Sequence, residues 1–75
     1  MSDSRYGRIS VFGYPHLATV YLDQEYVGEL PFTLDNIRPG THTLLIRKGA
    51  YKAWTKLVTV KQGETLFLEV YLDID

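Results

Sequence analysis

The two histidines, His16 and His42, are the side chains with the clearest potential for proton transfer or metal binding. An imidazole titrates near neutral pH, and beside a carboxylate such as Asp23 or Asp35 it could hold a metal ion. A metal centre would need both histidines and a carboxylate to converge, and no spacing in the sequence indicates that they do. His42 shares one side of its predicted strand with Leu44, which favours a structural histidine that hydrogen-bonds the backbone at a turn-to-strand junction.

The sequence also lacks the residue patterns of the other common catalytic and ligand-binding sites. The chain has no cysteine, its six glycines are isolated instead of forming a phosphate-binding loop, and its lysines and arginines are scattered at a net charge of -1. The carboxylates that could serve as an acid and base pair fall in turns or on the solvent side of strands: Glu25, Glu29, Asp35, Glu64 and Glu69. The sequence therefore predicts no catalytic residue, no cofactor, no metal and no nucleic-acid partner, and indicates that the protein is not an enzyme.

Short β-strands must position every one of these side chains. Apolar and polar residues alternate along almost the whole chain, and no window holds a sustained helical period. Turns are expected at Asp23-Gln24 and, as a hairpin, at Gln62-Gly63-Glu64. The alternation predicts strands in the ranges 7–13, 18–23, 25–28, 31–34, 41–48, 51–62 and 65–73.

The apolar sides of these strands supply the core of one domain, since 75 residues leave room for one modest core. We expect an all-β fold, a small antiparallel or mixed β-sandwich of about six to seven short strands. Residues 25–27 and 31–34 are the expected edge, which Pro31 and nearby charges would guard against promiscuous pairing. The predicted core is Ile9, Val11, Ala18, Val20, Leu22, Leu34, Ile37, Leu44, Ile46, Trp54, Val58, Val60, Leu66, Leu68, Val70 and Leu72.

The domain is expected to span residues 7–73, with an N-terminal extension at 1–6 and a tail at 74–75. The first six residues lack the apolar run of a signal peptide, and no stretch approaches the roughly 20 apolar residues of a spanning helix. The chain is thus expected to be soluble, either as a small protein that is not exported by this route or as a domain of a longer polypeptide.

Two motifs stand out along the chain. The first is Val20-Tyr21-Leu22-Asp23, followed by Gly28 and Pro31, and the second is Pro39-Gly40-Thr41-His42 at the entry to a strand. Both resemble motifs of the PEGA domain family. The similarity extends from Gly7 to Leu72. The name-giving Pro-Glu-Gly-Ala stands here as Pro15-His16-Leu17-Ala18.

At the first hairpin the family usually has Asp-Gly, whereas this chain has Asp23-Gln24. A non-glycine at a positive φ would cost roughly 1 kcal/mol or more. A third departure is Ala50, which separates Gly49 from Tyr51. The resemblance implies a small bacterial or archaeal β-sandwich, often in cell-envelope proteins and appended to other domains, with no catalysis.

The outward sides of the strands carry larger apolar residues than a solvated surface needs: Phe12, Tyr21, Leu45, Leu57, Phe67 and Tyr71. One interpretation is that they form cross-strand pairs that stabilise a wet sheet. The other is that a subset forms a contiguous patch that docks a protein partner or a second copy of the chain.

These patterns favour a non-catalytic protein-interaction or scaffolding module within a larger assembly or multidomain protein. The alternative is a carbohydrate or cell-wall-binding module in which exposed aromatic rings stack on sugars. The candidates for that role are Tyr14, Tyr26, Tyr51 and Trp54, and a coplanar exposed pair would favour it. The identity of the partner and the compartment are not encoded in any motif.

Overall fold

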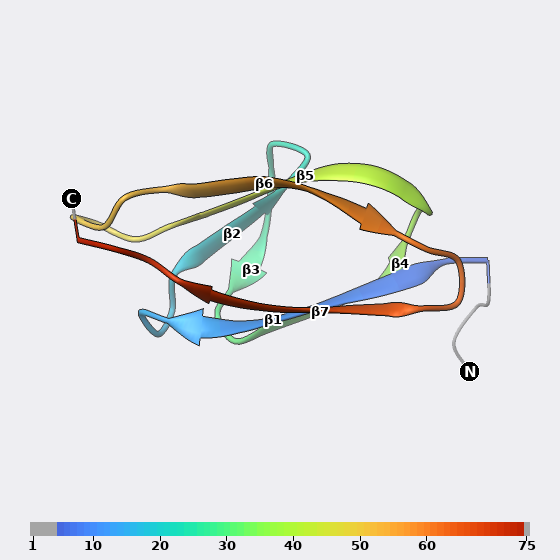
Figure 1. Cartoon of the computed structure of the whole chain (residues 1–75), viewed down its shortest axis with the longest axis horizontal. Coiled ribbons are helices and arrows are strands. Elements are labelled where there is room, and N and C mark those ends of the chain that lie inside the picture. Colours follow the sequence, from blue (N-terminus) through green and yellow to red (C-terminus); the bar gives the residue numbers. More distant parts are fainter. Residues whose placement is uncertain (1–4, 75) are drawn as a thin grey trace.

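The protein is a sandwich of two β-sheets in a computed structural model that describes residues 5–74 (Figure 1). This confirms the predicted all-β sandwich. The three-stranded sheet has the order β4-β1-β7 and the four-stranded sheet the order β3-β2-β5-β6. The strands are β1 (Gly7–Tyr14), β2 (Thr19–Leu22), β3 (Glu25–Glu29), β4 (Phe32–Ile37), β5 (Gly40–Arg47), β6 (Trp54–Val60) and β7 (Thr65–Tyr71).

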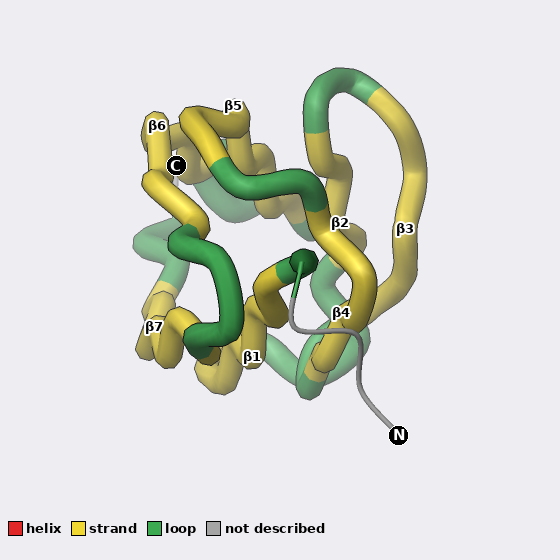
Figure 2. The backbone as a smooth tube through the Cα atoms, turned by 90° about the vertical axis from the view of Figure 1, so that its right-hand side faces the viewer, coloured by secondary structure: helices red, strands yellow, loops and turns green. Residues whose placement is uncertain are grey.

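The first and last strands lie side by side at the centre and edge of the three-stranded sheet. They run parallel from the pair Arg8 and Thr65 to the pair Tyr14 and Tyr71, whereas all other pairings are antiparallel. Viewed along the strands, β6 and β7 lie on one side of the sandwich and β3 and β4 on the other (Figure 2). The sandwich thus has four edge strands, two on each side.

The β2–β3 hairpin turns at Asp23-Gln24, as the sequence predicts. Leu22 pairs with Glu25, so the loop has two residues, with φ of 51° at Asp23 and 71° at Gln24. Positive φ at both loop residues is typical of a type I′ turn, whose twist matches that of the two flanking strands. The expected non-glycine in the left-handed region is therefore confirmed.

The segment after β6 is a turn, but the prediction of a hairpin there is wrong. The N–H of Glu64 donates to the carbonyl of Lys61 at 3.1 Å, and Gly63 has φ of 75°. The strands on either side belong to different sheets, so this turn is an arch that crosses between the layers. A local turn signal cannot distinguish the two, because hairpin and arch differ only in long-range pairing.

The core lies between the sheets and contains most of the predicted residues. Leu30 and Phe32 are buried as well, although the predicted core omits them: Leu30 lies between the predicted strands 25–28 and 31–34, and Phe32 follows Pro31 at the start of the second. Four predicted core residues are only partly buried and pack against the core: Leu34, Trp54, Leu66 and Leu68. All four lie on edge strands, where a missing neighbour exposes an inward side chain.

Both predicted edge segments lie on edge strands, but they belong to different sheets, 25–27 to β3 and 31–34 to β4. At the N-terminus, residues 1–4 of the expected extension fall outside the described part, whereas the carbonyl of Tyr6 accepts the N–H of Gly63 at 3.0 Å. At the C-terminus, Ile74 forms an isolated β-bridge with Tyr51, and Asp75 is outside the described residues.

Candidate functional site

Exposed aromatic side chains gather on the outer face of the three-stranded sheet. Ile9 and Val11 of β1 are buried, so the alternation turns Phe12 outward, where 49% of it is exposed. On the neighbouring strand, Phe67 is 69% and Tyr71 66% exposed. Phe12 pairs in register with Glu69, which lies between those two residues on the same face.

Tyr14 continues this set, since it pairs in register with Tyr71 and is also exposed. We call Phe12, Tyr14, Phe67 and Tyr71 the aromatic face. Beside it, the hydroxyls of Ser10 and Thr33 hydrogen-bond at 3.2 Å, and Arg8 of β1 pairs with Asp35 of β4. The arrangement is a strip of four exposed aromatic side chains with Glu69 among them, bordered by polar pairs on the same sheet.

The other three interface candidates lie on the opposite face of the sandwich. Tyr21 and Leu45 are half-buried cross-strand partners on the four-stranded sheet, whereas Leu57 is 67% exposed on β6. The guanidinium of Arg47 lies 5.5 Å from the centre of the Tyr21 ring, a distance at which a cation attracts an aromatic face. The six candidates therefore do not form one patch, because the sheets separate them into two groups of three.

The four candidate sugar-stacking residues are not brought together either. Tyr14 and Tyr51 meet at one end of the sandwich with their rings at 79°, and Tyr26 contacts Tyr21 at 73° on the four-stranded sheet. Neither pair is coplanar, and Trp54 packs partly against the core. A hydrogen bond with Tyr14 raises the pKa of the Tyr51 phenol above its ordinary value.

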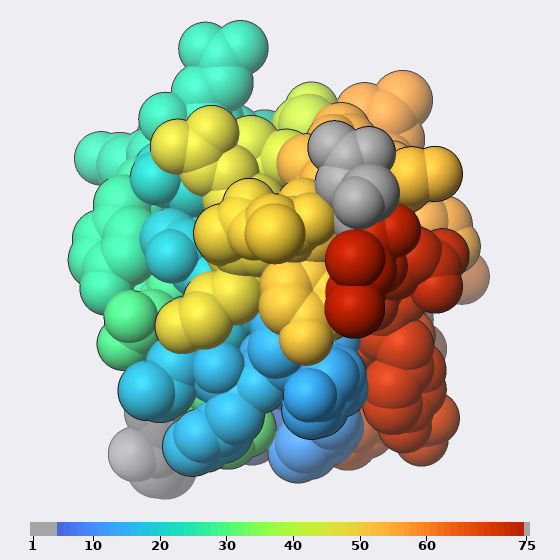
Figure 3. Space-filling model, turned by 90° about the vertical axis from the view of Figure 1, so that its left-hand side faces the viewer, coloured from blue at the N-terminus to red at the C-terminus, as the bar shows by residue number. Residues whose placement is uncertain are grey.

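The end that carries Tyr14 and Tyr51 is formed by segments distant in the sequence. In Figure 3 the loop after β5, in yellow, lies between the end of β1, in blue, and the last residues of the chain, in red. The N–H of Lys52 in this loop donates to the carbonyl of Asp73 at 2.7 Å. The same loop thus attaches the C-terminal segment to the four-stranded sheet.

His42 is held between two acceptors, and one of them is a backbone carbonyl, as predicted for a structural histidine at a turn-to-strand junction. Its Nδ1 lies 2.5 Å from a carboxylate oxygen of Asp23, and its Nε2 lies 2.6 Å from the carbonyl of Arg38. The second carboxylate oxygen of Asp23 accepts the N–H of Thr43 at 2.9 Å. A ring whose two nitrogens both face acceptors is best matched by the doubly protonated imidazolium.

The electrostatics follow from this geometry. The hydrogen bond to Asp23 raises the pKa of His42 above its usual 6.5 against the opposing effect of partial burial, and the Arg38 carbonyl adds to the rise. The hydrogen bond from His42 in turn lowers the pKa of Asp23 below 3.8, with the Thr43 N–H contributing. The pair fastens the β2–β3 turn to the start of β5 and leaves no ring lone pair for a metal ion.

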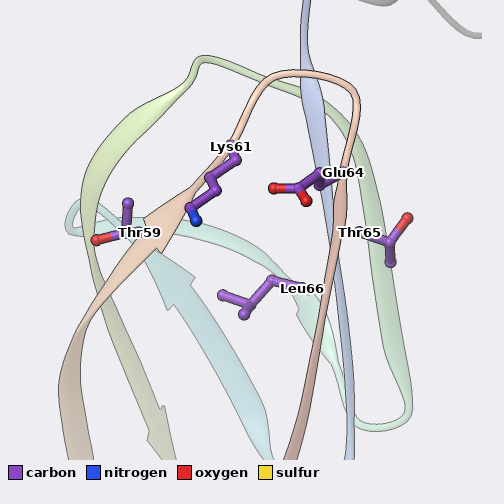
Figure 4. Close-up of a pocket in the computed structure, with 5 residues that line it drawn as sticks. All are labelled: Thr59, Lys61, Glu64, Thr65 and Leu66. Atoms are coloured by element: carbon purple, nitrogen blue, oxygen red, sulfur yellow. The ribbon is translucent and has the colours of Figure 1, made fainter.

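No cluster in residues 5–74 brings together three side chains able to hold a metal ion. The second histidine, His16, is exposed in the loop after Pro15. A shallow hollow of about 220 Å³ lies at the arch between β6 and β7 (Figure 4). Leu66 points into it, with Lys61 and Glu64 at its rim and Thr59 and Thr65 beside them.

A comparison with family models matches residues 6–74 to the PEGA domain. The chain belongs to the PEGA domain family. The match covers nearly the whole chain and confirms the resemblance seen in the sequence. No curated protein matches the chain. In this PEGA domain the two sequence motifs meet in space, since Asp23 ends the first and His42 ends the second.

Within residues 5–74, none of the secondary structure is a helix with the length and apolar character to cross a membrane.

Proposed function

We propose that this PEGA domain is a non-catalytic protein-interaction or scaffolding module that works in a larger assembly or multidomain protein. The observation that carries the proposal is the aromatic face, where four exposed rings gather on one sheet. Exposed apolar patches on small domains commonly mark interaction sites, and aromatic residues are enriched at the centres of interfaces. An assembly at the cell envelope is the setting that the family resemblance suggests.

In this proposal the Asp23–His42 pair has a structural role. His42 is engaged at both ring nitrogens, so it has no free nitrogen with which to accept a proton from a substrate. The exposed carboxylates Glu64 and Glu69 have neither a dry cleft nor a partner that would tune them for acid and base work.

Carbohydrate binding is the less favoured alternative. Sugar rings stack best on exposed flat aromatic platforms, and the tyrosine pairs of this domain stand edge to face instead. The polar side chains beside the aromatic face are already paired, Ser10 with Thr33 and Arg8 with Asp35, which leaves them less available to a sugar hydroxyl.

The proposal is tested by photo-crosslinking in cells that express the chain. A benzoylphenylalanine at Phe12 or Phe67 should capture the same protein, whereas the photoprobe at Leu57 on the opposite face should not. With that protein purified, Phe12→Ser and Phe67→Ser should each weaken binding by about tenfold, a usual loss for an interface residue that carries much of the affinity. Leu57→Ser is the matched control.

Equal capture from both faces, or capture from neither, would refute the assignment of the aromatic face. Binding of a cell-wall glycan that Tyr14→Ser and Tyr51→Ser abolish, with no protein captured, would favour the carbohydrate alternative instead.

A further inference from the structure

The four edge strands differ in how well they are protected against pairing with another chain. Strand β4 follows Pro31, which has no N–H to donate, and carries the Arg8–Asp35 ion pair across to β1. Strand β3 begins and ends with glutamates, and its pairing with β2 contains a bulge next to Val20. Proline, charge and bulges are the usual devices that protect an edge.

Strand β6 is protected by a lysine. Lys56 pairs in register with the buried Leu44, so its Cβ projects from the core face of the sheet, yet the side chain is exposed. It must therefore leave the sandwich through the open side. A charge that starts on the inward face of an edge strand would be desolvated by a neighbouring strand, which disfavours pairing there.

Strand β7 has neither a proline nor a bulge, and its one charged residue, Glu69, points to the outer face of the sheet. Its seven residues, Thr-Leu-Phe-Leu-Glu-Val-Tyr, include no proline, glycine or lysine and one glutamate. Its only pairing among the described strands is with β1, so its other side is a free edge. It and β6 are the longest edge strands, with seven residues each, and of the two only β6 carries a lysine.

The backbone groups on that free edge can be identified from neighbouring hydrogen bonds. The carbonyl of Glu64 accepts from Arg8 and the N–H of Leu72 donates to Tyr14, so even-numbered residues face β1. Since N–H and C=O alternate sides along a strand, odd-numbered residues face outward. The bond from Lys52 to the carbonyl of Asp73 lies on this outward side and confirms the alternation. The free edge thus presents the amides of Thr65, Phe67, Glu69 and Tyr71.

We propose that the free edge of β7 pairs antiparallel with β7 of a second copy of this chain, with Leu68 on the two-fold axis. The inference goes beyond the proposed function, because it concerns the backbone edge of β7 and a second copy of the chain, although Phe67 and Tyr71 of the aromatic face lie on the same strand. The pairing joins the two three-stranded sheets into one, β4-β1-β7 followed by the partner's β7-β1-β4.

This register is the one in which the strand complements itself. Phe67 lies opposite Glu69 of the second copy and Thr65 lies opposite its Tyr71, so each outward N–H and C=O gains a partner. Moving the axis to Glu69 would place two like charges opposite each other, which is destabilising. It would also require the carbonyl of Asp73, which already binds Lys52.

Apolar side chains at this edge support the same occupant. Leu66 and Leu68 face inward but are only half-buried, because no strand lies beyond them. An identical strand carries the same inward row, so Leu68 meets Leu68 of the second copy and both leave water. Lys56 keeps the β6 strands apart, so the copies join through one sheet. One strand pair is small beside the roughly 1,200–2,000 Å² of a stable interface, so the dimer is weak.

Charge variants at Phe67 test the inference by sedimentation equilibrium at rising concentration. Phe67→Lys places a cation opposite Glu69 of the second copy and should tighten the dimer, whereas Phe67→Glu places like charges together and should loosen it. Because the contact occurs twice, the two dissociation constants should differ by roughly tenfold, and added salt should reduce the difference. Tyr26→Lys and Tyr26→Glu carry the same net charges on exposed β3 and should associate like the unmodified chain.

Cysteine cross-linking tests the register, since the chain has no cysteine of its own. A mixture of Phe67→Cys and Glu69→Cys should form disulfide-linked dimers faster than either variant alone, because opposed residues lie about 5.5 Å apart at Cα. Equal rates for the mixture and the single variants would overturn the register and with it the proposal.

A chain that stays monomeric at millimolar concentration would overturn the proposal, as would a dimer indifferent to the charge at Phe67. Neither result touches the proposed function, which stands or fails on the capture of a different protein at Phe12.

Discussion

The two sides of the sandwich are built from the same alternating strands, yet one side is closed and the other open. On the side of β3 and β4, Leu30 is 1% exposed and Phe32 is buried, although Val27 and Leu34 are only partly buried. A Cβ on Gly28 would come within 2.9 Å of the Phe32 ring, so backbone and ring are in close contact there. On the side of β6 and β7, Trp54, Leu66 and Leu68 remain half-buried.

The difference comes from the connections. Two residues, Leu30 and Pro31, join β3 to β4, and the apolar residues beside that short link cover the seam between the sheets. The β6–β7 arch consists of Lys61, Gln62, Gly63 and Glu64, whose side chains are polar or absent and cover nothing. Alternation therefore decides which way a side chain points, and the connections decide how deeply it is buried.

The largest expected effect is the removal of a side chain from the closed side. Leu30→Ala should lower the free energy of unfolding by about 2–5 kcal/mol, because the side chain is fully enclosed and leaves a cavity. The same change at Leu68 should cost clearly less, since water and neighbouring side chains can fill the gap. Urea unfolding of both variants measures this, and equal losses would contradict the distinction between the two sides.

The pairing of β7 with β1, which holds β7 on the open side, can be tested at Gly13. A Cβ there would lie 1.7 Å from the carbonyl oxygen of Val70 in the paired strand, so Gly13→Ala should destabilise the domain by about 1–3 kcal/mol through overpacking. Hydrogen exchange should accelerate most at β7. Gly49→Ala is the control: nothing lies within 4 Å of its Cβ, and its φ of 45° should cost about 1 kcal/mol.

The Asp23–His42 pair predicts a pH dependence that does not involve the open side. The folded pKa of His42 lies above 6.5, so its contribution is complete below pH 6.5 and is lost as the pH rises through the folded value. The folded pKa of Asp23 lies below 3.8, so its contribution is present above pH 3.8 and is lost as the pH falls through the folded value.

Between these limits the pair should stabilise the fold by about 1 kcal/mol or less, because the carboxylate is half-exposed. Urea midpoints across this pH range should show that dependence, and His42→Gln should remove it while His16→Gln retains it. A profile unchanged by His42→Gln would show that other groups cause the dependence.

The smallest effect is expected where the open side is made apolar. Lys56→Leu removes an exposed charge without filling a cavity, so the free energy of unfolding should change by only about 0.5 kcal/mol. Self-association should increase, because the protection of β6 is gone. A loss of stability comparable to that of Leu30→Ala would mean that Lys56 is structurally required and the open side is not open.

The strands and their inward sides could be predicted because alternation is a local property. The left-handed turn at Asp23-Gln24 was predictable for the same reason, since its length and flanking strands determine it. The allocation of β6 and β7 to different sheets, and the shallow burial of Leu66 and Leu68, depend on long-range pairing that no local pattern records.

The contact between Asp23 and His42 was missed because the two residues are 19 positions apart. A signal for it exists only once the β2–β5 register is known, since pairing Leu22 with Leu44 brings Asp23 beside Thr43. The separation of the interface candidates into two faces has the same origin. The alternation along a strand identifies the residues that point outward, but only the order of strands in the sheets shows which of them share a surface.

The parallel pairing of β1 with β7 has a mechanical consequence. Strands β1 and β7 lie side by side and point the same way, so β1 begins and β7 ends at opposite extremities of the sandwich (Figure 1). A pulling force applied between the start of β1 and the end of β7 would slide one strand along the other and load all the bonds from Arg8 to Tyr14 at once. The domain should therefore resist stretching far better than a hairpin, whose bonds open one after another.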